Sequence, residues 1–228
     1  MSIISDKHKC IFIRIPKTGT SSVEQAFNLN DPGSVTPDND IPHGHHGWEE
    51  VKSMAGDKRW KSYFKFCIFR DPIDWVTSNI VYSTKFYWDK NLYGRLIKEK
   101  IDDYVIDHPT IPDSVALKSL ETVQVDGLIT KEDVDAFINL RKFWNRPKNH
   151  QFQSDWVPDD IDLIIDFANL ESGWSQVKEK LGLDFDIPWV NKGNYTEGME
   201  YGFTNPALEY TKEYYKKDIQ IYEGICKQ

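Results

Sequence analysis

The chain has 228 residues, of which 39% are hydrophobic and 14% aromatic, so it is long enough to bury a substantial core. Its formal net charge of −8 argues against a general nucleic-acid-binding protein. No apolar run could cross a bilayer, and the N-terminus lacks the hydrophobic region of a signal peptide. We therefore expect one domain over residues 1–228, located in the cytoplasm, with neither nucleic acid nor a membrane as a partner.

The first motif is a predicted strand that turns into a helix. Residues 11–15, Ile-Phe-Ile-Arg-Ile, form a mostly apolar run rich in β-branched residues, and helical spacing of apolar residues follows at 23–27. Between them, Gly19 allows a tight turn and Lys17 adds a full positive charge. Such a turn directs backbone N–H groups and the positive end of the helix dipole to one point, which predicts a site for a phosphate or a similar anion. The candidate ligands are Lys17, Thr18, Gly19, Thr20, Ser21 and Ser22.

This loop differs from the Walker A motif of nucleotide triphosphatases. That motif places two glycines before its lysine, whereas Lys17 precedes the only glycine of the loop. A nucleotide triphosphatase is therefore disfavoured. On this motif alone, an ordinary strand-to-helix turn capped by a Thr or Ser hydroxyl remains an alternative.

A histidine cluster follows a predicted long loop over residues 28–42. His43, His45 and His46 lie within four residues, just before a short predicted helix over 48–54. Three close histidines also suggest a metal site, but no Cys or carboxylate stands at ligand spacing in this stretch. We therefore predict no metal.

The second motif is a further predicted strand, residues 63–69, followed by Arg70, Asp71 and a helix that begins at Pro72. Ser78 lies about two turns into that helix. An arginine fork and a hydroxyl can hold a phosphate at a second point, so Arg70 and Ser78 are candidate ligands. Taken alone, Arg70 and Asp71 could equally form a structural ion pair beside a helix cap.

Helices and one further strand are predicted in the rest of the chain. Strands that alternate with helices imply an α/β fold, with a parallel sheet flanked by helices and ligands bound at the carboxyl ends of the strands. The remaining helices are expected over most of 73–108, near 114–124, at 131–143, at 170–181 and from Thr204 to about Gly224, with a strand at 162–167.

Two smaller patterns have structural interpretations. A basic stretch could face a cofactor or an acidic acceptor, although a solvated helix end is slightly favoured; its members are Arg141, Lys142, Arg146 and Lys148. Cys10, Cys67 and Cys226 show no metal-ligand spacing and are expected to be free thiols.

The two anion motifs resemble those of a known family. Pro-Lys-Thr-Gly-Thr-Ser-Ser at 16–22 is similar to the 5′-phosphosulfate loop of sulfotransferases that use 3′-phosphoadenosine 5′-phosphosulfate (PAPS). Phe-Arg-Asp-Pro at 69–72, followed by Ser78, is similar to their 3′-phosphate motif. Weaker similarities continue in order at 153–156, 162–170, 181–183, 188–194 and 214–218, and the resemblance is closest to the carbohydrate branch, which includes the heparan sulfate and chondroitin 2-O-sulfotransferases.

This resemblance implies a sulfotransferase fold related to that of the P-loop NTPases. It implies PAPS as sulfate donor, no required metal, and a hydroxyl acceptor such as a sugar or glycan. His45 matches the histidine thought to be the catalytic base in the 2-O-sulfotransferases, with His43 in support, and Lys17 would stabilise the leaving phosphate. Histidine suits a base because its reference pKa of about 6.5 leaves it mostly neutral near pH 7. The rival bases are carboxylates nearby in the sequence, Asp38, Asp40 and Glu49.

Two other functions stay open. A nucleotide-dependent kinase or phosphotransferase would need a carboxylate that holds magnesium after a strand, and Asp166 is the candidate. A non-catalytic nucleotide- or glycan-binding protein could retain the same scaffold. The set of Lys17, Arg70, Ser78 and His45 favours an enzyme over the binding protein.

Overall fold

The structure is a computed structural model that describes residues 2–34, 46–88, 127–144, 150–188 and 201–227. The chain forms two compact units. The first unit comprises Met1–Pro72, Phe152–Gly193 and Lys216–Gln228, and the second comprises Ile73–Gln151 and Asn194–Tyr215.

The first unit is built on a four-stranded sheet in the order β1-β2-β3-β5. Strands β2, β3 and β5 are parallel, and only the edge strand β1 runs antiparallel to its neighbour. The expected α/β fold with a parallel sheet is thus confirmed, whereas the antiparallel edge strand β1 is too short to have been predicted from its apolar pattern. The strands are β1 (Ile3–Ser5), β2 (Cys10–Ile13), β3 (Phe64–Phe69) and β5 (Leu163–Asp166).

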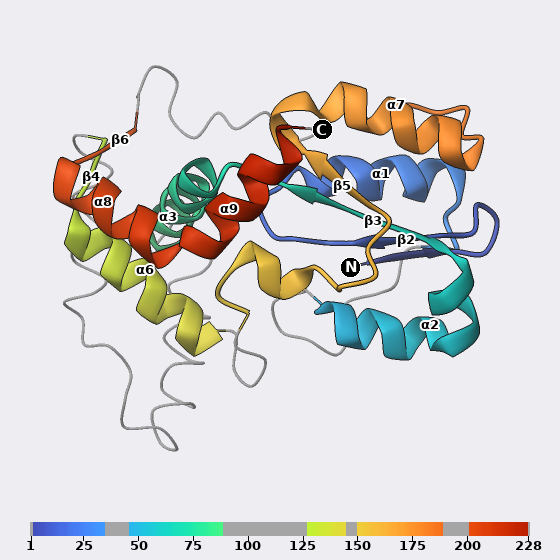
Figure 1. Ribbon diagram of the computed structural model, residues 1–228, viewed down its shortest axis with the longest axis horizontal. Coiled ribbons are helices and arrows are strands. Elements are labelled where there is room, and N and C mark those ends of the chain that lie inside the picture. Colours follow the sequence, from blue (N-terminus) through green and yellow to red (C-terminus); the bar gives the residue numbers. More distant parts are fainter. Residues whose placement is uncertain (1, 35–45, 89–126, 145–149, 189–200, 228) are drawn as a thin grey trace. The chain divides into compact units, whose positions relative to one another are not determined.

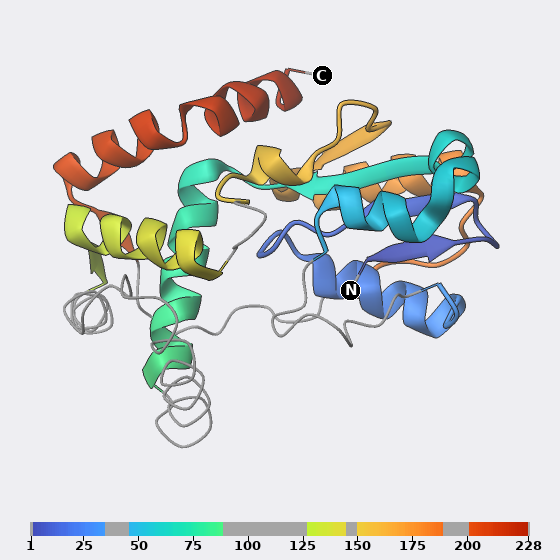
Figure 2. The ribbon, with the colours of Figure 1, turned by 90° about the horizontal axis from the view of Figure 1, so that it is seen from below.

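Helices cover both faces of this sheet (Figure 1). Helices α1 (Thr20–Asn30) and α7 (Leu170–Leu181) pack on one face. Helix α2 (Trp48–Ser62), the short 3-10 helix η1 (Gln153–Trp156) and α9 (Lys216–Ile225) pack on the other face. Seen from below, α2 lies in front of the strands (Figure 2). A second 3-10 helix, η2 (Phe167–Asn169), joins β5 to α7.

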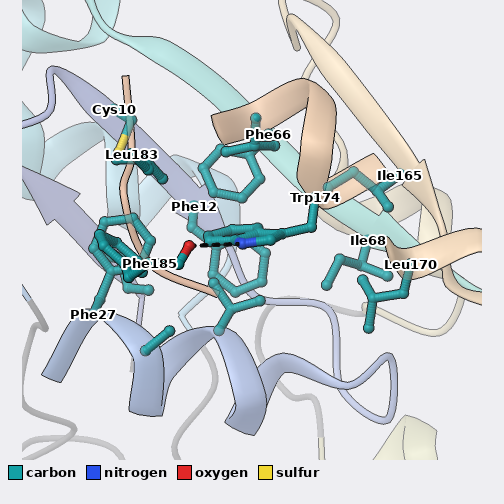
Figure 3. Close-up of a cluster of buried hydrophobic side chains, with 14 residues drawn as sticks. Cys10, Phe12, Phe27, Phe66, Ile68, Ile165, Leu170, Trp174, Leu183 and Phe185 are labelled. Atoms are coloured by element: carbon teal, nitrogen blue, oxygen red, sulfur yellow. Dashed lines mark hydrogen bonds between the residues drawn. The ribbon is translucent and has the colours of Figure 1, made fainter. Parts of the chain in front are cut away.

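The two cores follow from the alternation of side chains along the strands. Phe12 and Phe66 face each other across the parallel register, with ring centroids 5.0 Å apart, and pack under α1 and α7. The neighbouring residues Ile13 and Cys67 point to the opposite face, where they pack under α2. Trp174 closes the first core and donates a hydrogen bond of 3.2 Å to the carbonyl of Phe185 (Figure 3).

In its described residues, the second unit contains three helices and a short parallel pair of strands. Its elements are α3 (Pro72–Trp88), β4 (Leu128–Ile129), α6 (Lys131–Trp144), β6 (Gly202–Phe203) and α8 (Asn205–Tyr214). Helices α6 and α8 lie side by side in Figures 1 and 2. The Tyr210 hydroxyl of α8 donates a hydrogen bond of 2.5 Å to Asp135 of α6. Trp75 of α3 packs edge-on against Phe137 and Tyr215 in the core of this unit.

Two helices differ from the sequence-based expectation. Helix α2 runs on to Ser62, well past the expected end near residue 54, and it bends at Gly56, where φ is +75°. The expected C-terminal helix is two helices, because α8 ends at Tyr214, the buried Tyr215 is its C-cap, and α9 starts at Lys216. The start of α8 is as expected, with the Thr204 hydroxyl accepting a hydrogen bond from the Ala207 N–H. The helix expected near 114–124 and the end of the 73–108 helix lie outside the described residues.

The packing of α7 on β5 depends on Gly173. A Cβ at this position would lie 2.2 Å from Cγ2 of the buried Ile165. We expect Gly173→Ala to lower the free energy of unfolding by about 1–3 kcal/mol, because the helix and strand must separate to admit the methyl group. Urea denaturation measures this change. The matched control is Gly224→Ala in α9, where no described atom lies within 4 Å, so it should be neutral or stabilise by up to about 1 kcal/mol.

Candidate active site

Three connections meet at the carboxyl ends of the parallel strands in the first unit. They are the β2–α1 loop with Lys17 and Gly19, Arg70 after β3, and Phe167 after β5. The parallel register pairs Ile13 with Cys67 and Phe69 with Asp166, so all three connections leave the same edge of the sheet. This is the edge at which α/β proteins bind their ligands.

The β2–α1 loop has a left-handed backbone at two positions. Lys17 has φ of +65°, which is uncommon for a residue with a side chain, and Gly19 has φ of +76°. Gly19 also lies against Phe167, because a Cβ at Gly19 would be 2.9 Å from Cε2 of that ring. Glycine is therefore required here by both the backbone conformation and the close approach.

The hydroxyl groups of the loop have different environments. Thr18 is fully buried, and its hydroxyl donates a hydrogen bond of 2.9 Å to the Ile15 carbonyl, which holds the loop closed. Thr20 begins α1 and accepts a hydrogen bond of 3.1 Å from Nε of Arg14. Ser21 is half-buried and Ser22 is buried, both in the first turn of α1. The N-cap residue of this helix is Gly19, which has no side chain to cap the first N–H groups.

Lys17 and Arg70 form a pair of positive charges at this edge. Nη1 of Arg70 donates a hydrogen bond of 3.3 Å to the Lys17 carbonyl, and the guanidinium carbon lies 4.8 Å from the centroid of the Phe167 ring. Burial and, to a smaller extent, the Arg70 charge lower the pKa of Lys17 to about 8. The Arg70 charge acts on Lys17, so an anion bound at this edge would relieve the repulsion between the two cations.

Arg14 is a residue of this site that the sequence analysis missed. It follows β2, and its guanidinium forms an ion pair of 3.3 Å with the Glu24 carboxylate. The same guanidinium donates a hydrogen bond to the Thr20 hydroxyl. The available signal was a basic residue at a strand exit, three positions before Lys17. Its bonds tie the end of β2 to the first turn of α1.

A hollow opens beside the first turn of α1. It has a volume of about 290 Å³. Both apolar and polar side chains line it, from the starts of α1 and α7 and from the segment after α7. They are Ser22 of α1, then Leu170, Glu171, Trp174 and Ser175 of α7, and then Asp186, Ile187 and Pro188. The hollow is large enough for a planar ring system.

The remaining predicted site residues are Ser78, the histidine cluster and the rival carboxylate bases. Ser78 is buried in α3 and belongs to the second unit, so its pairing with Arg70 stays a prediction. His43 and His45 lie outside the described residues, as do Asp38 and Asp40. His46 is buried just ahead of α2. The rival base Glu49 is exposed in the first turn of α2.

Asp166 has a structural role in the connection from β5 to α7. One of its carboxylate oxygens accepts hydrogen bonds from the Ala168 N–H at 3.0 Å and the Tyr222 hydroxyl at 3.1 Å. The other accepts from the Asn169 amide at 2.7 Å. The carboxylate proposed for magnesium in a kinase is thus engaged as a helix cap. No group of three or more His, Cys, Asp or Glu side chains is placed to hold a metal ion within the described part of the chain.

The family model described as the sulfotransferase family matches residues 1–158, which include both anion motifs. The chain therefore belongs to the sulfotransferase family, and the protein is an enzyme that transfers sulfuryl groups. No curated protein and no solved structure matches the chain. Within the residues that the structure describes, no helix is both long enough and apolar enough to cross a membrane.

The influence of Arg70 on Lys17 can be measured directly. Carbon NMR of the Lys17 Cε reports the titration of the amine, which we expect near pH 8. We expect the pKa of Lys17 to rise in Arg70→Gln. The direction follows because a neighbouring positive charge disfavours the protonated amine. Arg59→Gln is the control, since Arg59 pairs with Asp6 at the opposite edge of the sheet. An unchanged Lys17 pKa in Arg70→Gln would show that the two charges do not interact.

Proposed function

We propose that this sulfotransferase uses PAPS as its donor and holds it at the carboxyl edge of β2, β3 and β5. The observation that carries the proposal is the placement of Lys17 beside Arg70, at the ends of two neighbouring parallel strands. Lys17, Thr18, Gly19, Thr20, Ser21 and Ser22 would surround the 5′-phosphosulfate, and Arg70 with Ser78 would hold the 3′-phosphate.

The described residues fit such a donor. PAPS is a polyanion, and the positive charges of Lys17 and Arg70 lie beside the N-terminus of α1, where backbone N–H groups and the helix dipole favour negative charge. Thr18 would contribute through its backbone N–H, because its hydroxyl is engaged with Ile15. The hollow beside Ser22 is next to the same helix turn, and we assign it to the adenine base.

The transfer requires a group that stabilises the leaving phosphate and a base for the acceptor. PAPS supplies a sulfuryl group that is bonded to a phosphate oxygen. The Lys17 ammonium would stabilise the negative charge that develops on this oxygen as the bond breaks. His45 would accept the proton of the attacking hydroxyl, with His43 in support. The acceptor proposed from the resemblance is a sugar or glycan hydroxyl.

The donor is tested by calorimetric titration with 3′-phosphoadenosine 5′-phosphate (PAP), the desulfated product of PAPS. We expect micromolar binding that weakens at least tenfold in Lys17→Ala and in Arg70→Ala, because each variant removes a charged hydrogen-bond donor worth about 1.5–3 kcal/mol. Arg59→Ala serves as the matched control, since Arg59 is an exposed cation on α2 that contacts Asp6. Binding of ATP as tight as that of PAP would contradict the proposal and favour a phosphotransferase.

The base is tested by comparing substitutions at two candidate residues, His45 and Glu49. With labelled PAPS and a panel of sugar acceptors, His45→Ala should lose about a hundredfold or more in turnover, while PAP binding persists, because the base acts on the acceptor proton. Glu49→Gln should keep its turnover. The reverse result, with Glu49→Gln inactive and His45→Ala active, would assign the base to the carboxylate.

A further inference from the structure

Arg70 is held through its backbone by the side chain of Gln153. The Gln153 amide accepts a hydrogen bond of 3.0 Å from the Arg70 N–H and donates one of 2.8 Å to the Arg70 carbonyl. Both polar groups of the Arg70 main chain are therefore bonded to one side chain that lies 83 residues further along the chain. Gln153 is fully buried, so these bonds are shielded from competing water.

Gln153 is in turn held by a buried carboxylate. Asp218 of α9 accepts a hydrogen bond of 2.7 Å from the Gln153 N–H and one of 3.1 Å from the Ser154 N–H. Asp218 has no exposed surface, and this burial raises the pKa of its carboxyl group. The hydrogen bonds from Ser154 and Gln153 lower the pKa and so offset part of that rise. The carboxylate thus fixes the first turn of η1, from which the Gln153 side chain projects.

These bonds form a continuous connection from α9 to the anion loop. Asp218 bonds the backbone of Gln153, Gln153 bonds the backbone of Arg70, and Arg70 bonds the carbonyl of Lys17. Lys17 has a positive φ, so its carbonyl direction depends on an uncommon backbone conformation that the Arg70 bond helps to hold.

We infer that Gln153 and Asp218 are positioning residues of the donor site: they set the direction of the Arg70 guanidinium and, through it, the position of Lys17. Neither side chain needs to contact the donor. This inference rests on the proposed function for the identity of the ligand, while the contacts themselves concern only residues of the first unit.

Two variants and a matched control test the inference. Asp218→Asn keeps the side-chain shape but replaces one acceptor oxygen by a donor, and Gln153→Met keeps the length but removes both bonds to Arg70. The control is Asp162→Asn, because Asp162 accepts a bond of 2.7 Å from the Lys65 N–H at the opposite edge of the same sheet. Thermal denaturation, calorimetric titration with PAP and carbon NMR of the Lys17 Cε are measured for each variant.

We expect both positioning variants to weaken PAP binding by about tenfold or more, by analogy with residues that orient metal ligands, whose loss costs about 10- to 100-fold in affinity. The Lys17 pKa should also rise, as Arg70 moves away from it. Asp162→Asn should change stability alone. If all three variants lower the melting temperature and leave both PAP binding and the Lys17 pKa unchanged, Gln153 and Asp218 are structural only, and the inference is wrong.

The two readouts separate this inference from the proposed function. If the wild-type protein does not bind PAP, the assignment of the donor fails, but the Lys17 titration still reports on the position of Arg70. A shift in the variants would then support the positioning role for another anion. An unchanged titration would overturn it.

Discussion

The parallel alignment of β2, β3 and β5 is the constraint on which the rest of the site depends. Parallel strands end at one edge of a sheet, so the connections after them meet there although they are far apart in the sequence. Phe167 lies against Gly19 on one side and under the Arg70 guanidinium on another. Each of these three residues follows a different strand, so a change in strand register would separate them.

Several features of this edge cost stability in the free protein. Lys17 is partly buried beside another cation, which lowers its pKa, and it also has a left-handed backbone. Features that disfavour the free state but suit an anion are expected at a binding site. The surrounding structure offsets them with buried bonds: Thr18 to Ile15 within the loop, and the bonds of Gln153 and Asp218 behind Arg70.

Local patterns in the sequence predicted most of the first unit. The strand–loop–helix at Lys17 and the strand that ends before Arg70 have strong apolar patterns, and α7 has the predicted bounds of 170 and 181. The edge strand β1 and the break at Tyr215 were missed, because three residues carry no periodicity and a helix break at a tyrosine has no local signal. The role of Asp218 was missed because its partner Gln153 lies 65 residues away.

The sequence by itself determined the class of enzyme, since the two anion motifs are short, local patterns and the family match over residues 1–158 is read from the order of residues alone. It also determined which loops would carry the charges, because a basic residue at a strand end is visible in the order of residues. Only the tertiary structure decided that Arg70 lies beside Lys17, that the Thr18 hydroxyl turns inward, and that Gln153 holds Arg70. These contacts join residues on different elements, and their geometry follows from strand register and packing, which local sequence patterns do not specify.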